Sequence, residues 1–370
     1  MKIKIERLEL INRLNKISKA ISTNTPRPIL KAIKIEALNE RIVYTAFNDD
    51  IGIQTYSNDK EKFSILEEGV CLVFGERLIN VVIRMENKYI DIDDMEKSFL
   101  SVYDEKSKNQ IATFNTELYP LINFTTNESE KWFEIERFEE KIKKIIFLVD
   151  QNSKNDVLKG CDIKVKDGNL YLMATDSYKA GIYVTKIDTL KEYEFVIPGI
   201  NLDHYISIVE KEDKTTKVYL SSEKLIIKNE NTSFQSRIIN GSYPFNGIIK
   251  HLDIEIVCSV KVDKEELLKA IDRSSVLRSD NNETVKIEIK QNKLTIMNKD
   301  DKGLFNEDIE LNEKIGVDII INLNQKKLQS IISSFDSKVI NLKSAGFNKV
   351  LIVDSDKDVE LKHIIMPLLK

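Results

Sequence analysis

The sequence predicts an α+β protein built from three tandem copies of one domain. Three segments share an alternating apolar and polar pattern, an Asp-containing turn and a glycine, at 41–52, 170–181 and 294–303. Their glycines are 129 and 122 residues apart, at Gly52, Gly181 and Gly303. That step is too long for a solenoid repeat and fits a domain. We expect each glycine to supply backbone freedom in φ and the domains to span 1–127, 128–254 and 255–370.

Each domain is predicted to hold two helices and several antiparallel strands. The chain opens with an alternating strand at residues 1–6. Apolar residues at helical spacing predict a first helix in each domain, at 7–21, 137–149 and 264–277. Segments in matching order predict a second helix, at 75–85, 199–210 and 322–335. Alternating runs such as 217–229 and 286–297 are typical of half-buried antiparallel strands.

Composition argues against several classes of protein. No apolar run approaches the roughly 18 residues that span a membrane, and residues 1–6 do not resemble a signal peptide, so we expect a cytoplasmic protein with no membrane partner. Cys71, Cys161 and Cys258 lack CxxC spacing, which favours buried free thiols. The chain has three histidines and neither a GxGxxG nor a GxxxxGK[ST] motif. We therefore expect no catalytic residue, metal site or cofactor.

The net charge of −4 argues against a nucleic-acid partner, but the distribution of charge argues for one. In the first predicted helix, Arg13, Lys16 and Lys19 lie opposite an apolar stripe. Basic residues recur on the equivalent helices of the other two domains. One basic helix face is usually only solvated, whereas three at equivalent positions indicate a contact with phosphates that is independent of base sequence.

Five short motifs, in collinear order along the whole chain, resemble the bacterial DNA polymerase III beta subunit, the replicative sliding clamp. They are Met1-Lys2-Ile3, 25–30, 174–179, Ser242-Tyr243-Pro244 and 365–370. The resemblance implies DNA-clamp domains with antiparallel sheets outside and two helices per domain inside. It implies a head-to-tail homodimer that closes as a ring around duplex DNA. Such a ring has no catalytic activity and serves as a processivity factor, because it tethers a polymerase to its template.

The resemblance also implies two binding surfaces. The DNA-facing residues would be Arg13, Lys16, Arg27, Arg77, Lys141, Lys144, Lys154, Lys269 and Arg273. A cleft between the second and third domains would receive short linear peptides from the DNA polymerase III catalytic subunit, the clamp loader, other polymerases and repair proteins. Its wall would be Leu158, Thr175, Ser177, Tyr178, Lys179, Pro244, Ile248, Ile249, Met366, Pro367 and Leu368.

Two other functions compete with this interpretation. One is a clamp-like paralogue with a scaffolding role, which the sequence alone does not separate from a replicative clamp. The other is a metal-dependent enzyme acting on nucleic acid, with Asp49, Asp176 and Asp300 as ligands. These aspartates occupy equivalent turns of separate domains, whereas two-metal chemistry needs carboxylates around ions about 4 Å apart. We therefore expect them to be turn residues.

Overall fold

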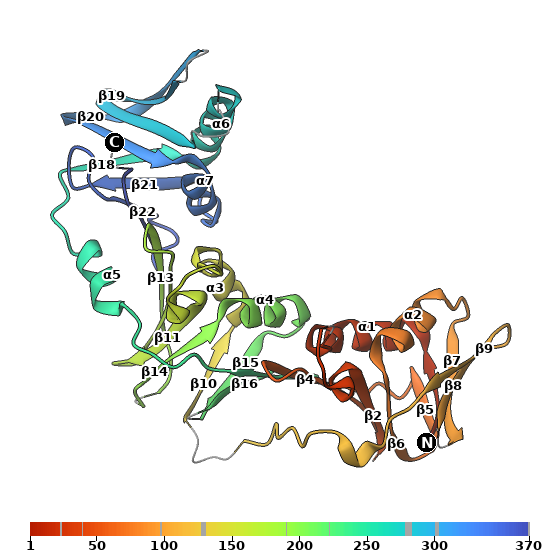
Figure 1. Cartoon of the computed structure of the whole chain (residues 1–370). Helices are drawn as coiled ribbons and strands as arrows, with labels where there is room; N and C mark the ends of the chain where they lie inside the picture. The colour runs from red at the N-terminus through yellow and green to blue at the C-terminus, as the bar shows by residue number, and fades with distance from the viewer. Residues whose placement is uncertain are drawn as a thin grey trace. The chain divides into compact units, whose positions relative to one another are not determined.

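The computed structural model describes residues 1–22, 24–38, 40–96, 98–126, 131–189, 191–221, 223–277, 283–299 and 303–368. The chain divides into two compact units, residues 1–139 with 201–238, and residues 140–200 with 239–370. Each unit is built on one antiparallel eight-stranded sheet (Figure 1). The described part of the chain contains no helix long and apolar enough to cross a membrane.

The first unit holds two sheets. Its eight-stranded sheet has the order β10-β15-β16-β17-β4-β3-β2-β6. These strands are β2 (Ala32–Leu38), β3 (Arg41–Phe47), β4 (Ile51–Ser57), β6 (Gly69–Phe74), β10 (Lys131–Glu136), β15 (Thr215–Leu220), β16 (Lys224–Lys228) and β17 (Thr232–Arg237). A five-stranded sheet follows the order β5-β1-β7-β8-β9. It is formed by β1 (Lys2–Glu6), β5 (Phe63–Glu67), β7 (Tyr89–Glu96), β8 (Phe99–Tyr103) and β9 (Lys108–Ala112).

Helices of this unit bury one apolar stripe each. They are α1 (Arg7–Ile17), α2 (Gly75–Arg84) and most of α4 (Gly199–Ile208). Leu10, Leu14 and Ile17 recur at helical spacing and are buried, so α1 packs on β3 and β4. The predicted helices at 7–21, 75–85 and 199–210 are therefore confirmed, with α1 continuing into a short 3₁₀ helix, η1 (Ser18–Ala20).

The second unit repeats this plan. Its eight-stranded sheet has the order β14-β11-β12-β13-β23-β22-β21-β18. The strands are β11 (Gly160–Lys166), β12 (Asn169–Thr175), β13 (Lys179–Lys186), β14 (Tyr193–Pro198), β18 (Cys258–Asp263), β21 (Val339–Ser344), β22 (Leu351–Asp354) and β23 (Leu361–Ile365). Two long strands, β19 (Thr284–Lys299) and β20 (Leu304–Asn324), pair separately with two register shifts near Gln291.

The remaining predicted helices are present, and one further helix was missed. The structure has α3 (Phe138–Lys143) with the 3₁₀ helix η4 (Ile146–Leu148), α6 (Lys264–Ser274) with η6 (Ser275–Leu277), and α7 (Gln325–Ser333). The helix that sequence reasoning missed is α5 (Phe245–Leu252). All three cysteines are buried free thiols, as predicted. Burial raises the pKa of the Cys71 and Cys161 thiols well above the usual range, so both stay protonated.

The three-fold repeat is real, but its register differs by one residue from the expectation. Asp49 and Ser177 both adopt left-handed backbone, with φ of 71° and 72°. Asn48 Oδ1 accepts the Ile51 N–H at 3.0 Å, and Asp176 Oδ1 accepts the Lys179 N–H at 2.7 Å. The two turns therefore superpose as 48–51 on 176–179.

The expected role was wrong for Gly52 and Gly181. The superposed turns make Gly52 equivalent to Ala180, one residue before Gly181, and neither glycine has a positive φ. The position of Gly181 requires space, because a Cβ there would lie 2.4 Å from His363 Nδ1. In the third repeat, Lys299 and Leu304 are opposite each other on paired strands, as Phe47 and Gly52 are in the first. The turn residues 300–302 lie outside the described residues.

Candidate functional site

A groove of about 390 Å³ opens in the second unit. Its walls come from the 3₁₀ helix η5 (Asp156–Lys159), the β12–β13 turn, helix α5 and the end of β23. The lining residues are Asn155, Leu158, Thr175, Ser177, Tyr178, Lys179, Ala180, Ser242, Pro244, Gly247, Ile248, His251, Ile364 and Met366. Its volume lies in the range of pockets that bind small ligands or peptide side chains, roughly 300–1,000 Å³.

The β12–β13 turn forms one wall and is held rigidly. Asp176 Oδ1 accepts the backbone N–H groups of Tyr178 and Lys179 at 2.9 and 2.7 Å, and the Thr175 hydroxyl donates to Lys179 O at 2.8 Å. Ser177 takes the left-handed backbone that completes such a turn. The turn presents Tyr178 to solvent with 63% of the residue exposed. An exposed aromatic ring at a groove edge is an available contact for an apolar ligand.

Two lysines fix the polar side of this wall. Lys327 Nζ donates to Asp176 Oδ2 at 2.7 Å and lies 4.6 Å from the centre of the Tyr178 ring. Lys179 Nζ donates to Phe147 O at 2.7 Å. Burial lowers the pKa of Lys179, an effect that the Asp176 carboxylate partly opposes. The ring of Tyr178 is therefore oriented by a cation beneath it.

Helix α5 forms the opposite wall. Pro244, Gly247, Ile248 and His251 line the groove from this segment, and Ile248 is buried. Phe245 anchors the helix, because its ring packs edge-on against Tyr171 at 5.6 Å. The apolar spacing of 248, 249 and 252 was the available signal for this helix, but Gly247 and the short length obscured it.

The end of the chain forms the third wall. Strand β23 stops at Ile365, and the Met366 N–H donates to Tyr178 O at 2.8 Å. The Leu368 N–H donates to Asn322 O at 2.8 Å, so the segment beyond the strand is also tied down. Eight of the eleven predicted groove residues line the cavity. Ile249, Pro367 and Leu368 do not; Ile249 instead packs against the hydrophobic cluster below the groove.

A buried acid lies on the same sheet face as two residues of that cluster. Asp162 lies on β11, opposite Met173 and Val196, and is fully buried. Among the residues that the structure describes, neither carboxylate oxygen has a hydrogen-bond partner. Burial, reinforced by the charge of Glu194, raises the pKa of Asp162 to about 8. The carboxyl group is therefore mostly protonated at neutral pH.

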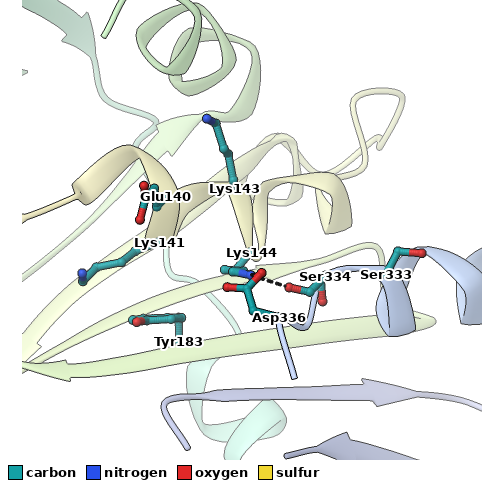
Figure 2. Close-up of a pocket in the computed structure, with 8 residues that line it drawn as sticks. All are labelled: Glu140, Lys141, Lys143, Lys144, Tyr183, Ser333, Ser334 and Asp336. Atoms are coloured by element: carbon teal, nitrogen blue, oxygen red, sulfur yellow. Dashed lines mark hydrogen bonds and ion pairs between the residues drawn. The ribbon is translucent and has the colours of Figure 1, made fainter. Parts of the chain in front are cut away.

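A second cavity of the second unit, of about 520 Å³, is lined by three lysines and two acidic residues (Figure 2). Its lining residues are Glu140, Lys141, Lys143, Lys144, Tyr183, Ser333, Ser334 and Asp336. Lys144 Nζ contacts Asp336 Oδ1 at 2.7 Å and Ser334 O at 2.8 Å, whereas Lys143 points away from this pair (Figure 2). The charge of Lys144 is thus neutralised at the carboxyl end of α7, where a cation is favourable.

Two of the predicted DNA-facing residues need correction. Arg13 and Lys16 are 7% and 5% exposed. Glu210 Oε1 lies 2.5 Å from Lys16 Nζ and 3.3 Å from Arg13 Nη1, and Arg13 Nε contacts Glu9 at 2.7 Å. Because buried cations cost free energy unless they are paired, this network is structural and presents no free charge to a ligand. The apolar stripe predicted that both cations lie on the opposite, exposed face, and it did not show that Glu210 covers them.

The other predicted cations vary in exposure. Arg77 lies 5.9 Å from the Phe74 ring, and Lys269 makes an exposed pair with Glu265 at 3.6 Å. Lys141 is half-buried and Lys154 is exposed. Exposed ion pairs join Arg27 to Asp49 and Arg273 to Glu307.

The aspartates considered as metal ligands are engaged elsewhere. Asp49 pairs with Arg27, and Asp176 serves the turn and Lys327. Asp300 lies outside the described residues. Among the residues that the structure describes, no three His, Cys, Asp or Glu side chains gather where they could hold a metal ion.

The three repeated α+β domains and the groove define a protein of the clamp class, and comparison with known proteins gives its family. Sequence profiles of the N-terminal, central and C-terminal domains of the DNA polymerase III beta subunit match residues 1–123, 133–245 and 255–369. The chain belongs to the DNA polymerase III beta subunit family.

Relatives match over the full length. The beta sliding clamps of Staphylococcus epidermidis and Staphylococcus aureus are each 23% identical over 375 residues, which covers 100% of this chain and 99% of theirs. The crystal structure of the Bacillus subtilis sliding clamp has a TM-score of 0.93 at 22% identity, covering 100% of this chain and 99% of that one. The Streptococcus pyogenes beta subunit gives 0.92 at 22%, with 100% of both chains covered.

Proposed function

We propose that this protein is a processivity factor for DNA polymerase, a sliding clamp in which two copies close head-to-tail around duplex DNA. The observation that carries this proposal is the collinear match of three tandem clamp domains over the whole chain. A closed ring holds DNA by topology, so it needs no catalytic group of its own and raises the local concentration of a tethered polymerase. The protein would act in the cytoplasm, with domains at 1–127, 128–254 and 255–370.

The groove in the second unit is proposed as the docking site for partners. Apolar side chains of Leu158, Pro244 and Met366 line it, and the exposed Tyr178 ring stands at its rim. Such a groove suits an extended peptide with apolar anchors, and a Met side chain adapts to several related anchors. The partners would be the DNA polymerase III catalytic subunit, the clamp loader, other polymerases and repair proteins.

Binding to DNA is proposed to be independent of base sequence. Cations that remain exposed, such as Lys154 and Lys269, would contact phosphates, while Arg13 and Lys16 are withdrawn from that role by burial. With a net charge of −4, direct electrostatic affinity is expected to be weak. Encirclement then supplies most of the retention.

The decisive experiment loads the protein onto a nicked circular DNA with its clamp loader. The loaded protein should persist when salt is raised, because topology is not screened, and should be lost when the circle is linearised. Binding to a short linear duplex should be weak and salt-sensitive. Equal retention on circular and linear DNA would contradict encirclement.

The two alternatives receive less support. A metal-dependent enzyme acting on nucleic acid would need carboxylates gathered around its ions, whereas Asp49 and Asp176 are each neutralised by a cation of their own unit. A scaffolding paralogue would share the groove but not the polymerase. A comparison of the wild-type protein with a groove mutant distinguishes these functions. The proteins that each retains from a cell extract are identified, and a replicative clamp should retain a polymerase through the groove.

A further inference from the structure

One face of the eight-stranded sheet in the first unit carries basic residues without acidic ones. Strands β15, β16, β17, β4 and β3 are consecutive neighbours in this sheet. They contain five basic residues and no acidic residue, whereas acidic residues outnumber basic ones in the whole chain by 60 to 56. Fully buried residues such as Val218, Ile227 and Phe234 mark the core face of these strands. Because side chains alternate between faces, the basic residues lie on the opposite face: Lys217, Lys224, Lys228, Arg237 and Arg41.

A hollow of about 540 Å³ lies on that face. Three of its lining residues form a row across neighbouring strands, with Lys228 opposite Ser233 and Ser233 opposite Gln54. Directly opposite residues of antiparallel strands share one face, so these three side chains lie side by side under the hollow.

Aromatic rings bound the hollow on both sides of this row. Two residues before Gln54 on β4, Gly52 is covered, because a Cβ there would lie 3.3 Å from Phe124 Cζ. Two residues after Gln54, Tyr56 lines the hollow, and the Arg41 guanidinium lies 5.2 Å from the centre of its ring. The hollow is therefore a trench that crosses the strands between Phe124 and Tyr56, and we call it the cross-strand trench.

A further pair of rings adjoins one end of the cross-strand trench. Lys228 Nζ lies 5.4 Å from the centre of the Tyr219 ring, and that ring stacks on Trp132 with 6.1 Å between their centres. Trp132 is 39% exposed and is the single tryptophan of the chain. The path from Tyr56 through Lys228 thus continues onto an exposed aromatic pair.

Acidic residues balance part of the charge along this path. Glu230 lines the trench. Two exposed ion pairs also lie on this face: Arg237 with Asp50, and Lys217 with Glu134. Lys224 Nζ instead donates to two carbonyl oxygens, at 2.7 and 3.3 Å, and Arg41 contacts an aromatic ring. Since neither contact is with an acid, this face keeps positive charge that suits an anionic ligand.

We infer that the cross-strand trench and the Trp132–Tyr219 pair bind single-stranded nucleic acid independently of its base sequence. This inference goes beyond the proposed function, because encirclement concerns duplex DNA. The surface is also a different one, since it lies on the sheet face opposite helix α1, which packs on β3 and β4.

The chemistry of the surface favours a single strand over other anions. Nucleobases stack on exposed aromatic rings whatever their sequence, and lysine and arginine side chains contact the phosphates. The amides of Gln54 and Asn58 line the trench and can meet the polar edges of a base. A duplex keeps its bases stacked and paired, so it offers the rings nothing. An acidic peptide would satisfy the charges but not the rings.

The fluorescence of Trp132 tests the inference directly in the full-length wild-type protein. An oligothymidylate of about 12 nucleotides, a length within the usual site sizes of single-strand binders, should quench this fluorescence at low salt. The quenching should weaken as salt is raised, because phosphate contacts release counterions. A duplex of the same length and an oligoglutamate of the same charge should leave the fluorescence unchanged. Absence of quenching by the oligothymidylate, or equal quenching by either control, would overturn the inference.

Charge reversal at Arg41 tests the trench itself. Arg41→Glu should weaken binding of a dye-labelled oligothymidylate about tenfold in fluorescence anisotropy, because it removes a phosphate contact and adds repulsion. Arg41 is exposed at the start of β3, so the melting temperature should not change. Lys166→Glu makes the same charge change at an exposed position of the second unit and should bind as wild type does. Unchanged affinity in a folded Arg41→Glu protein would overturn the assignment.

Two further measurements separate the trench from the other proposed surfaces. Tyr178→Ala, which alters the groove of the second unit, should bind the oligothymidylate as wild type does, and a polymerase-derived peptide should not displace it. Loss of binding in Tyr178→Ala, or displacement by the peptide, would place the strand in the groove and overturn the inference. Loading of Arg41→Glu onto nicked circles should be normal, so failure of the trench and failure of encirclement are distinguished.

Discussion

At the scale of single residues, the most unusual group is the Asp162 carboxyl beneath the groove. Its carboxyl group is fully buried and has no hydrogen-bond partner among the described residues. Burial disfavours the charged form, which explains the raised pKa. The unfolded carboxyl has its ordinary pKa near 3.8. Between that value and about 8, the folded protein holds a proton that the unfolded chain releases. Stability therefore falls as pH rises through this window and levels off above it.

Asp162→Asn should remove this dependence. The amide keeps the shape of the side chain and cannot ionise, so the variant should lose the decline of up to about 1.4 kcal/mol per pH unit in the free energy of unfolding. It should be more stable than wild type at about pH 8. Urea denaturation between about pH 5 and pH 9 measures this. The exposed Asp188→Asn variant should keep the wild-type slope, and an unchanged slope in Asp162→Asn would contradict the assignment.

Tyr178 offers the matching test of the groove. Its ring is 63% exposed and lies over Lys327, so removing it should cost little folding stability. Tyr178→Ala should weaken the binding of a polymerase-derived peptide roughly 5- to 150-fold. This is the range expected when an apolar anchor contact of about 1–3 kcal/mol is lost. Calorimetric titration gives the affinity. Phe347→Ala removes an equally exposed ring that does not line the groove, and it should bind the peptide as wild type does.

At the scale of elements, the sequence predicted helices better than it predicted what covers them. The period of Leu10, Leu14 and Ile17 located α1, but the burial of Lys16 depends on Glu210, almost 200 residues away, and no local pattern reports it. Helix α5 was missed because eight residues with a glycine at the third position carry a weak helical signal. The groove was located by resemblance, whereas its wall from α5 and His251 required the folded chain.

The segment after β23 is an element whose removal separates binding from folding. The strand ends at Ile365, so deleting residues 366–370 leaves the sheet intact and removes the backbone bonds of Met366 and Leu368. We expect peptide binding and processive synthesis to be lost while the melting temperature changes little. Deleting only residues 369–370 is the control and should preserve binding. Wild-type affinity in a folded 366–370 deletion would show that partners dock elsewhere.

At the scale of the whole molecule, repetition carried the prediction furthest. Three domains and their order followed from segments that recur along the chain, because each copy needs the same strand, turn and helix signals to fold. The register of the repeat needed the structure, since Asp49 and Ser177 share a backbone conformation but not a residue type.

The distribution of charge supplies the last prediction. Because Arg13 and Lys16 are structural, only exposed cations can tune contact with DNA, and a combined Lys143→Glu, Lys154→Glu and Lys269→Glu variant should impair loading on nicked circles. It should also flatten the salt dependence of binding to a short duplex, since fewer counterions are released. Its fold and dimer mass should match wild type.

Lys16→Glu should act differently: it places a buried charge beside Glu210, so it should lower the melting temperature before any effect on DNA is seen. Thermal unfolding and native mass, measured beside loading, separate these effects. Normal loading by the triple variant would mean that the DNA path avoids these cations.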